Sequence, residues 1–165
     1  MNKKNLTSFA VVAVFLLVLV FLTATQSTNR EREVGDLAPK LEYSDIKYVK
    51  IAGVVVEVEL ALTSEEMSRG LSGRDTLPEN TGMLFVFDQL GKYSFWMKDM
   101  NFPIDIIWLT DDLHVIYIER NARPESFPET FGPDAEAKYI LEVMAGFAEK
   151  YNLKEGDKVE FLYQE

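Results

Sequence analysis

The sequence contains no cysteine and a single histidine among its 165 residues. Without cysteine the chain can form no disulfide, thiolate metal site, cysteine nucleophile or lipidated N-terminal cysteine. With His114 as its one histidine, it is a poor candidate for a histidine metal site or a Ser-His-Asp triad. A P-loop, a Rossmann fingerprint and a nucleophile elbow are also missing. We therefore expect neither a metal nor a cofactor.

Basic residues are also scarce, with 17 Lys and Arg against 27 Asp and Glu, which gives a formal charge of −10. A chain this acidic is poorly suited to nucleic-acid phosphate, so we expect no nucleic-acid partner. Hydrophobic residues make up 47% and charged residues 27%, which is a globular balance. The length allows one domain with an extension.

One long apolar run lies near the N-terminus. Residues 6–24 carry no charge and would span roughly 28 Å as a helix, close to the hydrocarbon core of a bilayer. Lys3 and Lys4 precede the run and should stay cytoplasmic. We predict that residues 1–24 form a signal anchor, a single-pass transmembrane helix that holds the C-terminal domain at the cell membrane, outside the cytoplasm. A cleaved signal peptide, which would give a secreted protein, is the alternative, although 22–26 offers only a weak small-residue cleavage site.

The segment 25–43 that follows is polar, charged and interrupted by Gly35 and Pro39. This composition is typical of a flexible tether. The exported domain should then occupy residues 44–165, which is enough chain for a single core.

Period-2 alternation predicts strands in this domain. Val54, Val56 and Val58 point one way while Glu57 and Glu59 point the other. Short apolar runs predict further strands, and a short helix is expected over 146–152. The expected strands cover Tyr48–Leu62 (or a hairpin kinked at Gly53), Met83–Phe87, Ser94–Lys98, Phe102–Leu109, Leu113–Arg120, Lys138–Ala145 (or a helix there) and Lys158–Tyr163.

A second short helix is predicted after the first strands. Thr63 and Glu66 have capping-box spacing, and Gly70 and Gly73 limit the helix to about two turns. The fold class is therefore mainly β (α+β): a small barrel- or sandwich-like antiparallel sheet with one or two short helices.

The segment 121–137 holds three of the six prolines and has no periodicity. A structureless connection of this length is uncommon inside a compact domain and is more often functional.

Two carboxylates stand where the strand patterns predict apolar residues. Asp105 shares a strand face with Ile107 and Leu109, and Glu142 shares one with Ile140 and Met144. A buried charge requires a partner or a shifted pKa.

Cations that could match these carboxylates are Arg69, Arg74 and Lys98, and alternation places Lys98 on the same strand face as Trp96. If these groups converge with Asp105 and Glu142, they form a polar cleft with an aromatic wall. The competing interpretation is a structural ion-pair network, for which the planar guanidinium of Arg is well suited.

Three functions follow from these groups. The first is a binding module for a small polar ligand such as a saccharide, stacked on Trp96 and held by Arg69, Arg74, Lys98, Asp105 and Glu142. The second is a hydrolase with Asp105 and Glu142 as acid and base. The third is a non-catalytic accessory domain, its charged cluster structural, that contacts an envelope protein through 121–137.

These residues also carry a resemblance to a family. Between Val54 and Phe161 the sequence resembles the domain-of-unknown-function family 192, also catalogued as uncharacterised protein family 0127. The blocks that carry it are RGLSGR at 69–74, GMLFVF at 82–87, FWMKDM with PIDII between 95 and 107, YILE with AG between 139 and 146, and GDKV at 156–159.

The resemblance implies a compact, mainly β domain, often exported, with no established activity. The family's motif positions fall on Arg74, Trp96, Lys98, Asp105 and Glu142. Ser72 and Ile104 stand where the family often has Met and Leu. Both departures change packing and leave the polar set intact.

Overall fold

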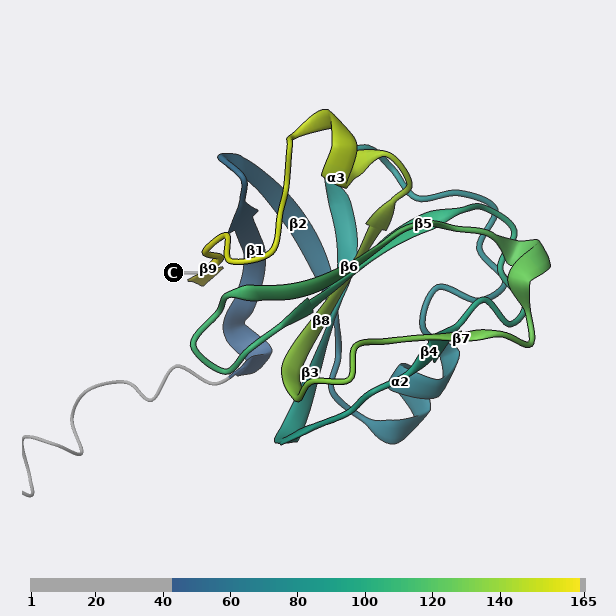
Figure 1. Ribbon diagram of the computed structural model, residues 1–165, viewed down its shortest axis with the longest axis horizontal. Coiled ribbons are helices and arrows are strands. Elements are labelled where there is room, and N and C mark those ends of the chain that lie inside the picture. Colours follow the sequence, from purple (N-terminus) through teal and green to yellow (C-terminus); the bar gives the residue numbers. More distant parts are fainter. Residues whose placement is uncertain (1–42, 164–165) are drawn as a thin grey trace, which may run out of the picture. The chain divides into compact units, whose positions relative to one another are not determined.

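The structure, a computed structural model, describes residues 43–163, and this part of the chain is mainly β (Figure 1). The predicted anchor at 1–24 and nearly all of the predicted tether lie outside the described residues. Within 43–163, none of the helices has the length and apolar character that crossing a membrane requires.

Nine strands, two short α-helices and two 3-10 turns make up this part. In chain order they are η1 (Tyr43–Asp45), β1 (Ile46–Ile51), β2 (Val54–Ala61), α2 (Ser64–Arg69), β3 (Thr81–Gly91), β4 (Phe95–Trp96), β5 (Ile104–Leu109), β6 (Val115–Ala122), η2 (Pro124–Ser126), β7 (Thr130–Phe131), β8 (Ala137–Met144), α3 (Phe147–Lys150) and β9 (Glu160–Tyr163).

Seven of the strands form one sheet in the order β6-β5-β8-β3-β2-β1-β9, and β4 pairs with β7 in a second, two-stranded sheet. The sheet is mixed, so the predicted antiparallel sheet is wrong in one place: β2 and β3 are parallel, with Val58 opposite Gly82. The physical reason is the connection 62–80, which includes α2. A crossover of that length lets the chain return to the start of β2, whereas a hairpin would reverse it.

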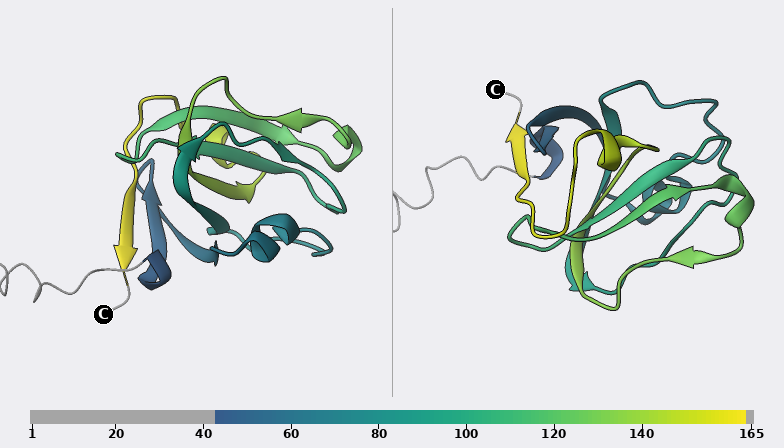
Figure 2. Two further views of the ribbon diagram at one scale, coloured as in Figure 1. Left: turned by 90° about the horizontal axis from the view of Figure 1, so that it is seen from below. Right: turned by 45° about the horizontal axis from the view of Figure 1, so that its top comes forward.

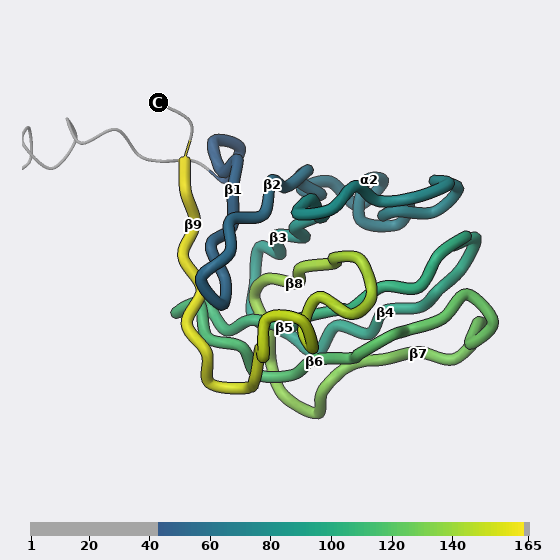
Figure 3. Tube along the Cα trace, turned by 90° about the horizontal axis from the view of Figure 1, so that it is seen from above, coloured from purple at the N-terminus to yellow at the C-terminus, as the bar shows by residue number. Residues whose placement is uncertain are grey.

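The two edges of the large sheet are joined at one end. His114 bridges to Lys158, and the Val159 amide donates to the Leu113 carbonyl at 2.8 Å. Strands β1 and β9 lie side by side at one end of the molecule, whereas α2, β4 and β7 lie at the other (Figures 1 and 3).

The central strands β3, β5 and β8 are buried on both faces, and each face packs its own core. One face presents Leu84, Ile107 and Leu141 to residues from β1, β9 and α3. The opposite face presents Phe85, Trp108 and Ile140 to the loops on either side of β4 and after α2. Figure 2 shows these layers from two further sides.

The segment 121–137, expected to be without structure, folds back over the molecule and supplies β7, in which Phe131 pairs with Phe95 of β4. The predicted strand at 94–98 is reduced to the two residues of β4. Tertiary contacts fix this short strand. The Trp108 indole donates to the Tyr93 carbonyl at 2.9 Å. The Phe95 ring packs edge-on against the Phe85 ring, with a centroid distance of 4.8 Å.

Candidate functional site

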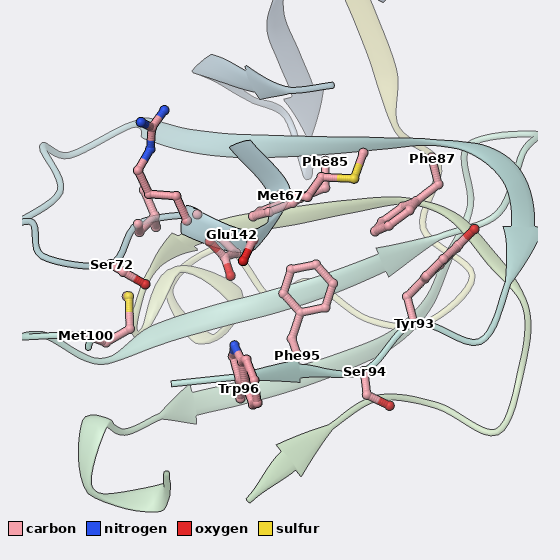
Figure 4. A pocket seen from close by; sticks show the side chains of 14 residues that line it. Met67, Ser72, Phe85, Phe87, Tyr93, Ser94, Phe95, Trp96, Met100 and Glu142 are labelled. Carbon is pink, nitrogen blue, oxygen red and sulfur yellow. The ribbon is translucent and has the colours of Figure 1, made fainter. Parts of the chain in front are cut away.

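A pocket of about 250 Å³ opens between α2 with its following loop, β3, the β4 segment and β8 (Figure 4). Half of its lining residues are aromatic or methionine, and Glu142 is the buried polar group. The lining residues are Met67, Ser68, Arg69, Gly70, Leu71, Ser72, Phe85, Phe87, Tyr93, Ser94, Phe95, Trp96, Met100 and Glu142.

Local sequence sets the position of the α2 wall. The predicted capping box is present, since the Thr63 hydroxyl accepts from the Glu66 amide at 3.2 Å and the Glu66 carboxylate accepts from the Thr63 amide at 2.9 Å. At the other end, Gly70 has φ +50° and ψ −133°, a conformation that favours glycine. A Cβ at Gly70 would lie 3.4 Å from the Phe85 ring and 3.9 Å from Glu142 Oε2, so the loop closes tightly over the carboxyl group.

Glu142 is 5% exposed, and its Oε2 atom has no hydrogen-bond partner. Burial raises the pKa of Glu142 to about 8, and the attraction of Arg74 opposes this shift only in part. Figure 4 shows the carboxyl group directed between Phe95, Trp96 and Met100. A buried, unpaired carboxyl group that lines a pocket is costly for folding, and such groups concentrate at functional sites.

Arg74 does not contact Glu142. Its guanidinium forms a two-pronged ion pair with Glu59 of β2, in which Nη2 donates to Oε2 at 2.8 Å. Hydrogen bonding to Arg74 also lowers the pKa of Glu59. The side-chain amide of Asn101 donates to the backbone carbonyl of Arg74 at 2.9 Å. This bond links the loop after α2 to the loop after β4. Arg74 therefore has a structural partner and only an indirect electrostatic effect on the pocket.

Asp105 lies outside the pocket, which corrects the predicted convergence. Strand β5 pairs with β8 so that Ile106 is opposite Glu142 and Asp105 is opposite Val143. Because side chains alternate between faces, the two carboxyl groups lie on opposite faces of the sheet. Asp105 is 1% exposed and accepts from the backbone amides of Asn121 at 2.9 Å and Ala148 at 2.8 Å. The two carboxyl groups therefore do not face one site, as the predicted hydrolase requires.

Trp96 forms the exposed rim of the pocket. The side chain is 51% exposed and contacts the Phe127 ring of the proline-rich segment at a centroid distance of 5.9 Å. The Lys98 ammonium lies 5.9 Å from the centre of the Trp96 ring. In the view of Figure 4 the indole nitrogen of Trp96 is on the side that faces Glu142.

Of the six predicted site residues, the structure places Arg69, Trp96 and Glu142 at the pocket and Lys98 beside Trp96. Arg74 and Asp105 have structural partners elsewhere. The sequence predicted Phe85 and Phe87 only as residues of a strand, and Gly70 only as a residue that ends the short helix. Phe127 was not predicted to lie near the site. The approach of Gly70 to Glu142 depends on a tertiary contact, which its position after the helix does not reveal.

The donor set does not suit a metal. Among residues 43–163, no group of three or more His, Asp or Glu side chains is arranged to hold a metal ion. Glu142 is the one carboxylate in the pocket lining, and single carboxylates are poor metal sites.

Comparison with known proteins decides the family. The family model DUF192, described as "Uncharacterized ACR", matches residues 47–161. The chain belongs to this family. The DUF192 match spans every strand from β1 to the middle of β9, and therefore all the residues that line the pocket. No curated protein matches the chain.

Solved structures share the DUF192 fold of this chain. A protein of unknown function from Novosphingobium aromaticivorans has 34% identity and a TM-score of 0.66, over 70% of this chain and 84% of that one. A protein from Sinorhizobium meliloti, described as a candidate transcription regulator, has 27% identity and a TM-score of 0.65, over 69% of this chain and 90% of that one.

Proposed function

We propose that the folded part of this chain is a binding domain for a small ligand, which enters the pocket between α2 and β4 and meets Glu142. The observation that carries this proposal is the buried Oε2 atom of Glu142, which has no hydrogen-bond partner. A ligand that pairs with the carboxyl group would offset the cost of burying it.

Two features of the pocket support the saccharide ligand expected from the sequence. Trp96 offers an exposed ring, and the pocket is lined by the hydroxyl-bearing residues Ser68, Ser72 and Ser94. Arg74 and Asp105, which were expected to supply further polar contacts, are engaged elsewhere. The remaining site is more apolar than predicted and suits a small ligand with one polar or charged group beside an apolar surface.

A thermal-shift screen of sugars, amines and other small polar compounds tests this proposal. We expect at least one compound to raise the unfolding midpoint of the wild type and to have a much weaker effect on Trp96→Ala, because the variant loses the wall of the pocket. Leu90→Ala is the matched control, since Leu90 is 45% exposed and lies outside the lining. If every stabilising compound acts equally on all three proteins, the pocket is not the binding site.

The setting of the domain stays a prediction. The apolar run at 6–24 supports a membrane-anchored protein whose pocket faces the exterior, where it would meet small solutes or an envelope protein. Protease accessibility of the domain on intact cells, compared with lysed cells, checks this orientation.

A further inference from the structure

We propose that the ligand of this pocket carries an alkylammonium group, whose positive charge lies between the Glu142 carboxylate and the rings of Trp96 and Phe95. This inference rests on the proposed function and specifies its ligand class. The ammonium group supplies a partner that makes ionisation of Glu142 favourable, and the aromatic wall supplies a surface that attracts cations.

The carboxyl group is the first reason. Glu142 is buried and lines the pocket, and Arg74, the cation whose charge acts on the pKa of Glu142, is held by Glu59. The other ionisable side chains in the lining are Arg69 and Tyr93. Arg69 interacts electrostatically with Glu59 and Glu66, and the Tyr93 hydroxyl donates to the Gln89 carbonyl at 2.7 Å. A cationic group of the ligand can therefore be the direct ionic partner of Glu142.

The wall is the second reason. Five aromatic residues and two methionines line the pocket, and aromatic faces attract cations that are positioned over the ring. The protein already makes one such contact at the rim, where the Lys98 ammonium lies over the Trp96 ring at 5.9 Å. This contact shows that a face of the Trp96 ring is accessible to a cation, and the exposed Lys98 side chain can move aside for a ligand. The formal charge of −10 also favours the approach of cations.

Binding of a quaternary ammonium ion has a simple proton balance. In the empty pocket at neutral pH the Glu142 carboxyl group holds its proton, because burial raises its pKa to about 8. A quaternary ammonium ion has no proton to exchange. When it pairs with Glu142, the carboxyl proton leaves to the solvent and the carboxylate remains beside the cation. Affinity should therefore rise with pH up to about 8, by roughly tenfold per pH unit.

Calorimetric titration of the full-length protein with choline tests the proposal, with 3,3-dimethylbutan-1-ol as the neutral isostere. At pH 8.5 we expect choline to bind at least about tenfold more tightly than the isostere. At pH 6.5 the difference should shrink, and titrations in buffers of different ionisation enthalpy should show a proton released on binding. In Glu142→Gln, which keeps the shape of the side chain, the preference for the cation and the proton release should both disappear.

A free solute and a lipid headgroup offer the same ammonium group. Co-sedimentation of the protein with phosphatidylcholine vesicles is therefore a second experiment that distinguishes the two. Sedimentation with vesicles that depends on Glu142 and Trp96 would assign the group to lipid, and binding of free choline alone would assign it to a solute. Either result supports the ligand class. Equal affinity for choline and the isostere at every pH, or no binding of choline at pH 8.5, overturns it. If sugars still stabilise the wild type through Trp96, the proposed function survives that failure.

Discussion

At the scale of single residues, Glu142 and Asp105 are both buried carboxylates, and their surroundings separate their roles. Asp105 receives two backbone N–H groups, which satisfy a carboxylate within the fold. Glu142 has an unpartnered oxygen and an apolar wall, and burial raises its pKa to about 8. The first arrangement satisfies the carboxyl group within the fold, and the second leaves one carboxyl oxygen without a hydrogen-bond partner.

The raised pKa of Glu142 predicts how stability depends on pH. The folded state binds the Glu142 proton more tightly than the unfolded state, whose ordinary pKa is 4.5. Proton binding by Glu142 therefore adds to the free energy of unfolding. This stabilisation is fully present below about pH 4.5 and is lost as pH rises to about 8, by up to about 1.4 kcal/mol per pH unit. Urea unfolding of the wild type and Glu142→Gln at pH 5, 6.5 and 8 measures this loss. The difference between their free energies of unfolding isolates Glu142, because all other titrating groups are present in both proteins. A constant difference across this range would show that Glu142 is ionised in the folded protein.

At the scale of elements, Asp105 joins three parts of the fold. It lies on β5, accepts from Asn121 at the end of β6, and accepts from Ala148 in α3. This contact holds α3 against the face of the sheet opposite the pocket.

Replacing Asp105 by Asn should therefore destabilise the fold and leave the pocket intact. The amide loses the charge and turns an N–H group toward a backbone N–H, which should lower the free energy of unfolding by about 2–4 kcal/mol. Urea unfolding measures this loss, with Asp75→Asn as an exposed control. Once folded, Asp105→Asn should bind the ligands of the wild type with unchanged affinity. Unchanged stability together with lost binding would instead place Asp105 in the site.

The sequence predicts the elements that depend on local signals. The capping box of Thr63 and Glu66 and the hairpin of β5 and β6 are present because neighbouring residues specify them. The burial of Asp105 and Glu142 also follows from their strand patterns. The face on which each carboxylate lies does not, because it depends on the register between β5 and β8, two strands far apart in the sequence. Phe127 was not predictable for a similar reason: its segment has no periodicity, and only the pairing of β7 with β4 brings it to Trp96.

At the scale of the whole molecule, the two faces of the central strands have different tasks. One face packs against β1, β9 and α3, with Asp105 as its buried polar group. The other packs against the α2 loop and the β4 segment and borders the pocket of about 250 Å³ that Glu142 lines. Both tryptophans lie toward this second face, yet Trp108 is fully buried while Trp96 is half exposed. Trp108 nevertheless borders the pocket lining, because its indole donates to the Tyr93 carbonyl.

NMR titration of the ¹⁵N-labelled full-length protein tests most directly whether a small ligand occupies the pocket over Glu142. We predict that a ligand found by the thermal-shift screen shifts the indole N–H signal of Trp96 and the amide signals of Gly70 and Ser94. The amide signal of Gly146, on the far side of β8, should stay unchanged. If the saturating shifts instead centre on Gly146 and Tyr151, which line a second cavity, the ligand binds there and not over Glu142. A Trp96 signal that does not move at saturation would likewise contradict binding over Glu142.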